Sequence, residues 1–193
     1  MNKNKYIVLC LFFFFNCDSR SQVELFPAYE FRYVENLVSE EITFPPFSIK
    51  IPNGFNKFSE QNLDILKNQI EKDSGAYFNK ELIHGFSDSL NTAFIISVIK
   101  EDKLLDRLNN GYSNYLDENN EEVVKNQYSI NNIKAVQYQT KNNLSNIGFT
   151  NLKIFLTSRD SVNYLLDFVI LDRNFNNILY SIESSLSTLK RKK

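Results

Sequence analysis

Residues 152–189 carry the clearest alternation of apolar and polar positions in the chain. Apolar and less apolar residues alternate at 152–157, the period of two that is typical of a β-strand with one buried face. Polar residues 158–161 interrupt this pattern, and apolar side chains then occupy both alternating sets at 162–171. A strand that is apolar on both sides usually lies in a sheet covered on both faces. We therefore predict a hairpin whose second strand is central in a sheet.

The apolar period changes after residue 174 to that of an α-helix. Apolar residues recur at intervals of three and four and form one stripe along residues 175–189. The residues of this stripe are Phe175, Ile178, Leu179, Ile182, Leu186 and Leu189. Such a helix buries its stripe by packing back onto the sheet. The basic residues 190–193 are expected to stabilise the negative end of the helix dipole and then to fray.

Earlier parts of the chain alternate between strand and helix patterns. We predict strands at 47–51, 92–99 and 133–140, a helix that begins after Ser59, and a helix over 104–116. The resulting order is strand, helix, strand, helix, strand, hairpin, helix. Strands that are neighbours late in the chain, with helices on the faces, indicate an α+β fold. We expect a mainly antiparallel sheet flanked by helices, in a sandwich.

Three stretches give no clear element. Residues 76–91 are ambiguous, and residues 117–122 are interpreted as an acidic loop. Residues 17–45 contain apolar side chains without a sustained period and are interrupted by proline. We therefore interpret residues 17–45 as a tether or linker, and residues 46–193 as the folded domain.

The first residues have the pattern of a secretory signal. Lys3 and Lys5 precede an apolar run over residues 6–15, which is shorter than the roughly 20 helical residues that span a bilayer. Cys17 follows this run, so residues 1–16 resemble a bacterial lipoprotein signal peptide that is cleaved before Cys17. The resemblance implies that the Cys17 thiol receives a lipid and that Cys10 is discarded. An ordinary signal peptide, or an N-terminal anchor with an incidental cysteine, is the alternative interpretation.

Lipidation at Cys17 would anchor the chain to a membrane, because two acyl chains suffice for stable attachment. We therefore expect a protein of the bacterial cell envelope, facing the periplasm or on the outer membrane. No second apolar segment approaches the length that spans a bilayer, so we expect the body after Cys17 to be a tethered, soluble domain.

Composition narrows the class of protein further. The chain is 42% hydrophobic and contains 17 Phe and 10 Tyr, enough for a sizeable core. Its formal net charge of −1 gives no general attraction to nucleic acid. Both of its Cys residues lie in the first 17 positions, so the body has no disulfide and no thiolate metal site. We expect no cofactor.

Three segments carry a resemblance to a known fold. They are Phe47-Ser48-Ile49-Lys50-Ile51-Pro52 followed by Gly54-Phe55, then Ile130-Asn131-Asn132-Ile133-Lys134-Ala135, and finally Tyr164-Leu165-Leu166-Asp167-Phe168 with residues 178–189. Together they resemble the PsbP/Mog1-like fold, which includes small bacterial lipoproteins of the DcrB and LpqN types. Asn132 stands where that family often has Gly. The resemblance covers roughly residues 46–190 and implies an α+β sandwich, but it implies no shared chemistry, because fold does not determine function.

His84 is the single imidazole and the main candidate for chemistry. On a helix, Glu81 at i−3 and Asp88 at i+4 would flank it with carboxylates. A zinc site normally needs three good protein ligands, and the chain has no Gly-x-Ser-x-Gly nucleophile motif and no glycine-rich phosphate loop. An enzyme is therefore the least favoured class.

Two short sequences resemble the O-glycosylation sequon of exported Bacteroidetes proteins. They are Asp88-Ser89-Leu90 and Asp160-Ser161-Val162, which make Ser89 and Ser161 candidate modification sites. The second falls on the predicted hairpin turn, where a glycan is readily accommodated.

Two functions remain in view. The first is a non-enzymatic, lipid-anchored envelope protein that binds another protein as an accessory, assembly or immunity factor. The second is a lipoprotein that binds a small apolar ligand between sheet and helices, where many aromatic side chains would be useful. An enclosed aromatic pocket would favour the ligand, and an exposed apolar patch would favour the protein partner.

Overall fold

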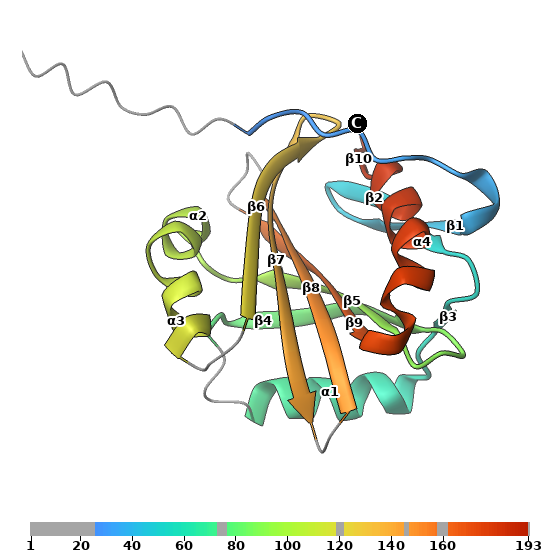
Figure 1. The fold of residues 1–193 in the computed structure, drawn as a ribbon, viewed down its shortest axis with the longest axis horizontal. Coiled ribbons are helices and arrows are strands. Elements are labelled where there is room, and N and C mark those ends of the chain that lie inside the picture. The colour runs from blue at the N-terminus through green and yellow to red at the C-terminus, as the bar shows by residue number, and fades with distance from the viewer. Residues whose placement is uncertain (1–25, 73–76, 119–121, 145–146, 158–161, 193) are drawn as a thin grey trace, which may run out of the picture.

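The fold is built on a large antiparallel sheet with a covering layer on each face (Figure 1). The computed structural model describes residues 26–72, 77–118, 122–144, 147–157 and 162–192. The strands are β1 (Val38–Phe44), β2 (Phe47–Pro52), β3 (Asn56–Lys57), β4 (Lys80–Ser87), β5 (Ala93–Ile99), β6 (Glu122–Ile130), β7 (Ile133–Leu144), β8 (Ile147–Thr157), β9 (Asn163–Leu171) and β10 (Lys190–Arg191). The helical segments are η1 (Glu35–Leu37), α1 (Glu60–Lys72), α2 (Leu104–Arg107), the π-helical turn η2 (Leu108–Tyr112), α3 (Ser113–Glu118), η3 (Asp172–Asn174) and α4 (Phe175–Ser187).

The large sheet has the strand order β3-β4-β5-β9-β8-β7-β6, and its pairs are antiparallel. A smaller sheet has the order β1-β2-β10. The α+β class with mainly antiparallel sheets is therefore confirmed. In the part of the chain that the structure describes, no helix is long and apolar enough to cross a membrane.

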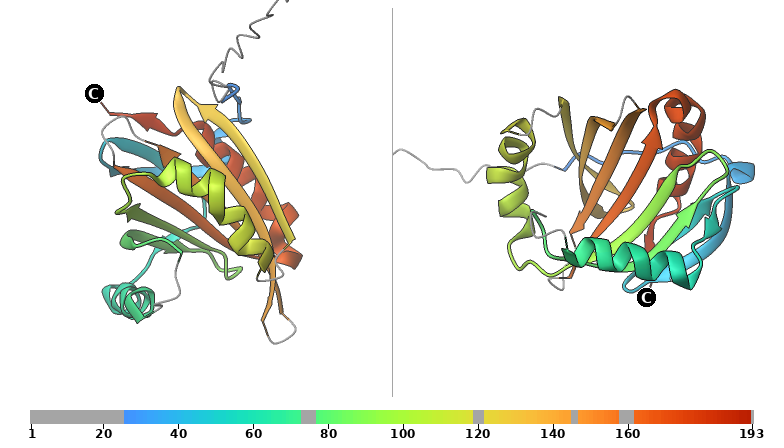
Figure 2. Two further views of the ribbon diagram at one scale, coloured as in Figure 1. Left: turned by 90° about the vertical axis from the view of Figure 1, so that its left-hand side faces the viewer. Right: turned by 90° about the horizontal axis from the view of Figure 1, so that it is seen from below.

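The central position of β9 follows from its sequence, as predicted. Tyr164, Leu166 and Phe168 lie in one core with α4 and the small sheet. Leu165 lies in a second core on the opposite face, together with Leu104 of α2 and other residues of the α2–α3 segment. A strand with two apolar sets is thus buried on both faces. Figure 2 shows α4 and the α2–α3 segment on opposite sides of the sheet.

Helices α1 and α4 confirm the predictions made from periodicity. The hydroxyl of Ser59 accepts a hydrogen bond from the amide of Asn62 at 3.2 Å, which is the expected N-cap of α1. Helix α4 buries Ile178, Ile182 and Leu186, three residues of its predicted stripe.

Several elements differ from the expectation. Residues 38–44 of the predicted linker form β1, which pairs with β2, so the ordered body begins before residue 46. The ambiguous stretch 76–91 contains β4, and β6 begins at Glu122 at the end of the predicted acidic loop. Residues 190–191 do not fray, because they form β10 against Phe47 and Ser48 of β2. These strands escaped prediction because neighbouring strands, which the local sequence does not reveal, provide their hydrogen-bond partners.

Candidate functional site: a groove between α4 and the β6–β7 hairpin

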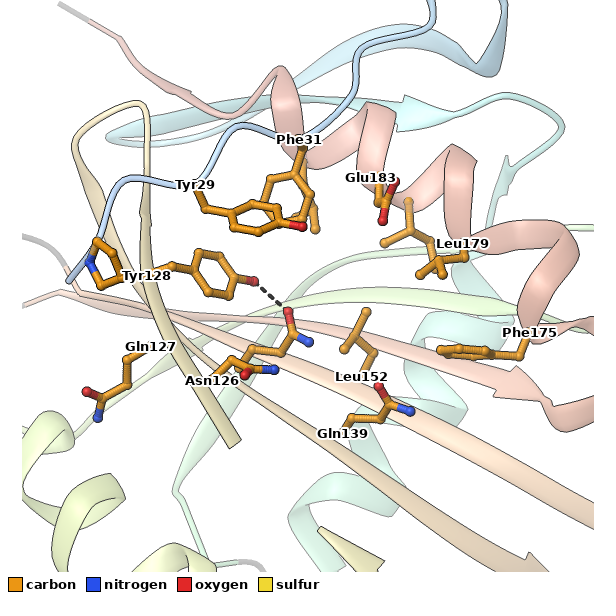
Figure 3. A pocket seen from close by; sticks show the side chains of 14 residues that line it. Tyr29, Phe31, Asn126, Gln127, Tyr128, Gln139, Leu152, Phe175, Leu179 and Glu183 are labelled. Carbon is orange, nitrogen blue, oxygen red and sulfur yellow. Dashed lines mark hydrogen bonds between the residues drawn. The ribbon is translucent and has the colours of Figure 1, made fainter. Parts of the chain in front are cut away.

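The candidate site is a groove with a volume of about 400 Å³ on the α4 side of the large sheet. We call it the α4 groove. Its lining comes from the segment before η1, from β6, β7 and β8, and from α4 (Figure 3). The lining residues are Pro27, Tyr29, Phe31, Asn126, Gln127, Tyr128, Gln137, Gln139, Leu152, Phe175, Leu179, Ile182, Glu183 and Leu186.

One wall of the groove is a face of α4. Phe175, Leu179, Ile182 and Leu186 recur at intervals of three and four and therefore project from one side of the helix. Ile182 and Leu186 are buried, whereas Phe175 and Leu179 are half-buried. Because Phe175 and Leu179 keep part of their surface accessible, this end of the helix presents apolar area to the groove.

The opposite wall is set by the register of β6, β7 and β8. Directly opposite residues of antiparallel strands share a face, so the pairs Asn126–Gln137 and Gln137–Ile154 form one row across the sheet. Gln139 pairs with Leu152 in the next row. Along the first row the side chains change from apolar on β8, under α4, to amides on β7 and β6. Along the second row they change from Leu152 on β8 to Gln139 on β7 and Val124 on β6. The groove therefore has one apolar wall and one wall of amides.

Aromatic rings close one end of the groove. Ala28 forms a parallel bridge with Ser129, which places the segment before η1 beside β6. The Tyr29 and Phe31 rings lie 5.6 Å from the Tyr128 ring, measured between centroids. The Tyr128 hydroxyl donates a hydrogen bond of 2.6 Å to Oε1 of Gln137 (Figure 3). Burial raises the pKa of Tyr128, so its hydroxyl stays protonated and can act as the donor of this hydrogen bond.

Polar groups along the groove remain open to a ligand. The side chains of Asn126, Gln139 and Glu183 have no hydrogen-bond or ion-pair partner among the described residues. The side-chain oxygen of Gln137 accepts the hydrogen bond from Tyr128, which leaves the amide N–H groups of Gln137 available. Gln127 points away from the groove in Figure 3 and donates a 2.9 Å hydrogen bond to Asn109. The available amides and the carboxylate suit recognition of a ligand with hydrogen-bonding groups.

The carboxylate cluster that a helix would place around His84 does not form. His84 lies on strand β4 and not on a helix, and its Nε2 lies 3.2 Å from the carbonyl oxygen of Thr43. Glu81 pairs with Lys100 at 2.9 Å, and Asp88 accepts hydrogen bonds from the amides of Leu90 and Thr92. Within the described ranges, no group of three or more His, Cys, Asp and Glu side chains could hold a metal ion. The helical spacing was therefore the wrong period for this segment.

The other predicted site residues fall in two groups. Ser89 is exposed in the turn between β4 and β5, where a glycan would meet solvent, and its modification stays a prediction. Cys17, Ser161 and the predicted signal peptide of residues 1–16 lie outside the described residues.

The sequence did not reveal the α4 groove. Tyr29 and Phe31 lie in the segment interpreted as a linker, and Asn126 and Tyr128 lie between two predicted elements. One signal was available: Val124 and Tyr128 occupy alternating positions among polar residues before Asn131-Asn132, a pair that favours a hairpin turn. That pattern identifies a strand, although it does not show that α4 lies opposite.

The fold is an α+β domain, and comparisons with solved structures find similar folds. No protein-family model matches the chain, and no curated protein matches its sequence. Among solved structures, the cyanobacterial PsbP protein (CyanoP) from Synechocystis is similar with a TM-score of 0.53 and 14% identity. The match covers 81% of this chain and 94% of CyanoP.

A second similar structure is LpqN of Mycobacterium tuberculosis, a protein involved in cell envelope biogenesis. The TM-score is 0.53 at 11% identity, and the match covers 80% of this chain and 90% of LpqN. Identities this low establish a shared fold and no more. The expected PsbP/Mog1-like architecture is therefore confirmed at the level of the fold.

Proposed function

We propose that this protein is a lipid-anchored accessory protein of the bacterial cell envelope that binds another protein in the α4 groove. The observation that carries the proposal is the pairing of an apolar helix wall with a wall of amides. Apolar area supplies affinity, and placed polar groups supply specificity, which is the usual division of roles in a binding site. Glu183, Tyr29 and Tyr128 are the ionisable residues of the lining, an inventory that suits binding better than acid–base catalysis.

The sequence and the fold support the envelope location. Lys3, Lys5, the apolar run 6–15 and Cys17 match the plan of a lipoprotein signal. The fold is shared with LpqN, which is involved in cell envelope biogenesis.

The anchor is tested by labelling cells with radioactive palmitate. We expect the wild-type chain and Cys10→Ser to carry label in the membrane fraction, and Cys17→Ser to carry none, because the thiol of Cys17 is the proposed acceptor. Cys10→Ser is the matched control, since it also removes one thiol. Equal labelling of the two variants would contradict the anchor.

Binding in the groove is tested by photocrosslinking in cells. A benzophenone side chain replaces either Leu179, which lines the groove, or Tyr180, which is 58% exposed and is not part of the lining. We expect one protein adduct of defined mass from position 179 and none from position 180, with the partner identified by mass spectrometry. An adduct formed equally from both positions would argue against the groove.

A small apolar ligand is the second candidate occupant. The volume of about 400 Å³ lies within the range of small-molecule pockets, and three aromatic rings surround one end. Mass spectrometry of solvent extracts from the purified full chain checks this candidate. If this candidate is correct, a small molecule copurifies with the wild type and is lost from Leu179→Trp, in which a larger ring fills the groove.

A further inference from the structure

We propose that the α4 groove accepts an extended peptide segment with apolar side chains and one basic side chain. The amides of Gln137 and Gln139, which face α4, point to this ligand. The inference rests on the proposed function, since it names the part of a protein partner that enters the groove. The backbone of such a peptide corresponds to the amides, its apolar side chains correspond to the α4 wall, and its basic side chain corresponds to Glu183.

The amides match the backbone of an extended chain. Gln137 and Gln139 are two positions apart on β7 and point to the same face, so they repeat at roughly 6.8 Å. Alternate residues of an extended peptide repeat at the same distance. A primary amide offers both a donor and an acceptor, as does each peptide group. Two glutamines in register can therefore hydrogen-bond alternate peptide groups of a bound segment.

The same amides disfavour an acyl chain. Gln139 and Asn126 have no partner among the described residues, and Gln137 retains its N–H donors. A hydrocarbon chain in the groove would remove water from these groups and supply no hydrogen bond in return, which is unfavourable. A peptide backbone replaces the lost water with hydrogen bonds.

The helix wall and Glu183 specify the side chains. Phe175 and Leu179 present half-buried apolar surface, which favours leucine, isoleucine or phenylalanine in the ligand. Glu183 follows Leu179 by one turn on the same side of α4, and in Figure 3 it lies between Leu179 and Phe31. Its carboxylate is half-buried and has no partner among the described residues. A lysine or arginine next to an apolar residue of the ligand would neutralise it.

The test is a selection from a phage-displayed library of random linear heptapeptides. The bait is the full lipidated chain, purified from membranes and incorporated into phosphatidylcholine nanodiscs. We expect enriched peptides to combine two or more large apolar residues with one lysine or arginine. Gln139→Leu and Asn126→Ala should each weaken binding of the enriched peptides about tenfold, because each removes an amide.

Charge preference is tested with two matched variants. In Glu183→Gln the selected peptides should retain the apolar residues and lose the preference for a basic residue, whereas Glu81→Gln, which removes a carboxylate from β4, should preserve it. Unchanged melting temperatures establish that the variants are folded. No enrichment, or a basic preference that persists in Glu183→Gln, would overturn the peptide assignment.

These outcomes are distinct from those of the proposed function. Failure of palmitate labelling at Cys17 removes the anchor and leaves the selection possible with the unanchored chain in buffer. Failure of the selection, with labelling and the position-179 adduct intact, removes only the extended peptide and leaves a partner with a folded surface.

Discussion

Lys153 and Asp167 form a bidentate ion pair on the face of the sheet opposite to the α4 groove. The Lys153 nitrogen lies 2.9 Å and 2.8 Å from the two carboxylate oxygens of Asp167, and the residues are direct cross-strand partners on β8 and β9. The Asp167 side chain is 8% exposed, and that of Lys153 is 21% exposed. Burial makes such a pair costly to break, because the remaining charge keeps its desolvation penalty.

Asp167→Asn is therefore expected to destabilise the protein by roughly 2–3 kcal/mol, since it leaves the Lys153 charge without its carboxylate. Glu122→Gln is the control, because it removes a carboxylate from an exposed pair with Lys141 at 3.7 Å and should cost less than about 0.5 kcal/mol. Urea denaturation of both variants measures the difference. Similar midpoints for the two variants would show that the pair contributes little.

Gly85 illustrates why single residues are hard to interpret from sequence. No local pattern in the sequence explains why position 85 is a glycine. In the structure, a Cβ on Gly85 would lie 2.6 Å from the Phe58 ring and 3.2 Å from Leu63. The residue is small because the segment leading into α1 packs over β4 at this point. That contact joins parts of the chain that local patterns treat separately.

At the scale of elements, the β6–β7 turn connects the two walls of the groove. Asn131 and Asn132 have positive φ angles of 47° and 63°, the conformation of a type I′ hairpin turn. Asn at both positions satisfies this turn, so a glycine at position 132 is not required. The Asn131 amide also donates hydrogen bonds to the carbonyl oxygens of Ser187 and Leu189, at 3.1 Å and 2.8 Å. The end of α4 is thereby held against the hairpin.

Asn131→Gly keeps the left-handed turn and removes only the side-chain hydrogen bonds. We expect it to cost about 1–2 kcal/mol of stability and to increase amide hydrogen exchange at the end of α4. Asn132→Gly, at the neighbouring positive-φ position, should change stability by less than about 0.5 kcal/mol. Equal effects of the two substitutions would mean that backbone conformation, and not the link to α4, dominates.

Elements were predictable where one face is strongly apolar. The central strands β5 and β9 and the helix α4 have a sharp period because a core covers them. The edge strand β1 has three consecutive exposed residues. Strand β6 has exposed residues at alternating positions and no buried residue before Tyr128. Their pairing depends on partner strands more than on their own apolar content. Local periodicity is therefore a poor guide at the edges of the sheets.

At the scale of the molecule, the groove joins segments that are distant in the sequence. Its lining runs from Pro27 to Leu186, and the amide wall exists only because β6 and β7 extend past the area that α4 covers. The two layers were predictable from the apolar faces of β9 and α4. The position at which α4 and the large sheet diverge could not be predicted, because it depends on strand register and on packing around the Tyr128 ring.

The small sheet gives the molecule a predicted response to acid. The Lys190 ammonium donates a 2.8 Å hydrogen bond to Glu41, which lowers the pKa of that carboxyl below its ordinary value of 4.5. A carboxyl with a lower pKa in the folded state contributes stability above the unfolded value, and this is lost as the pH falls through the folded value. The urea midpoint of Glu41→Gln should therefore lie below that of the wild type at pH 7. The difference should shrink as the pH falls below 4.5, whereas a constant difference would contradict the pair's role.

Strand β10 has a consequence for biosynthesis. It pairs with Ser48 and Phe47 of β2, and the Lys190–Glu41 contact joins positions 149 residues apart. A ribosome delivers β1 and β2 long before β10, so the small sheet lacks its third strand until residues 190–191 have been synthesised. Until then the edge of β2 has no partner from β10, and the small sheet is completed only after the intervening body of the domain has been made.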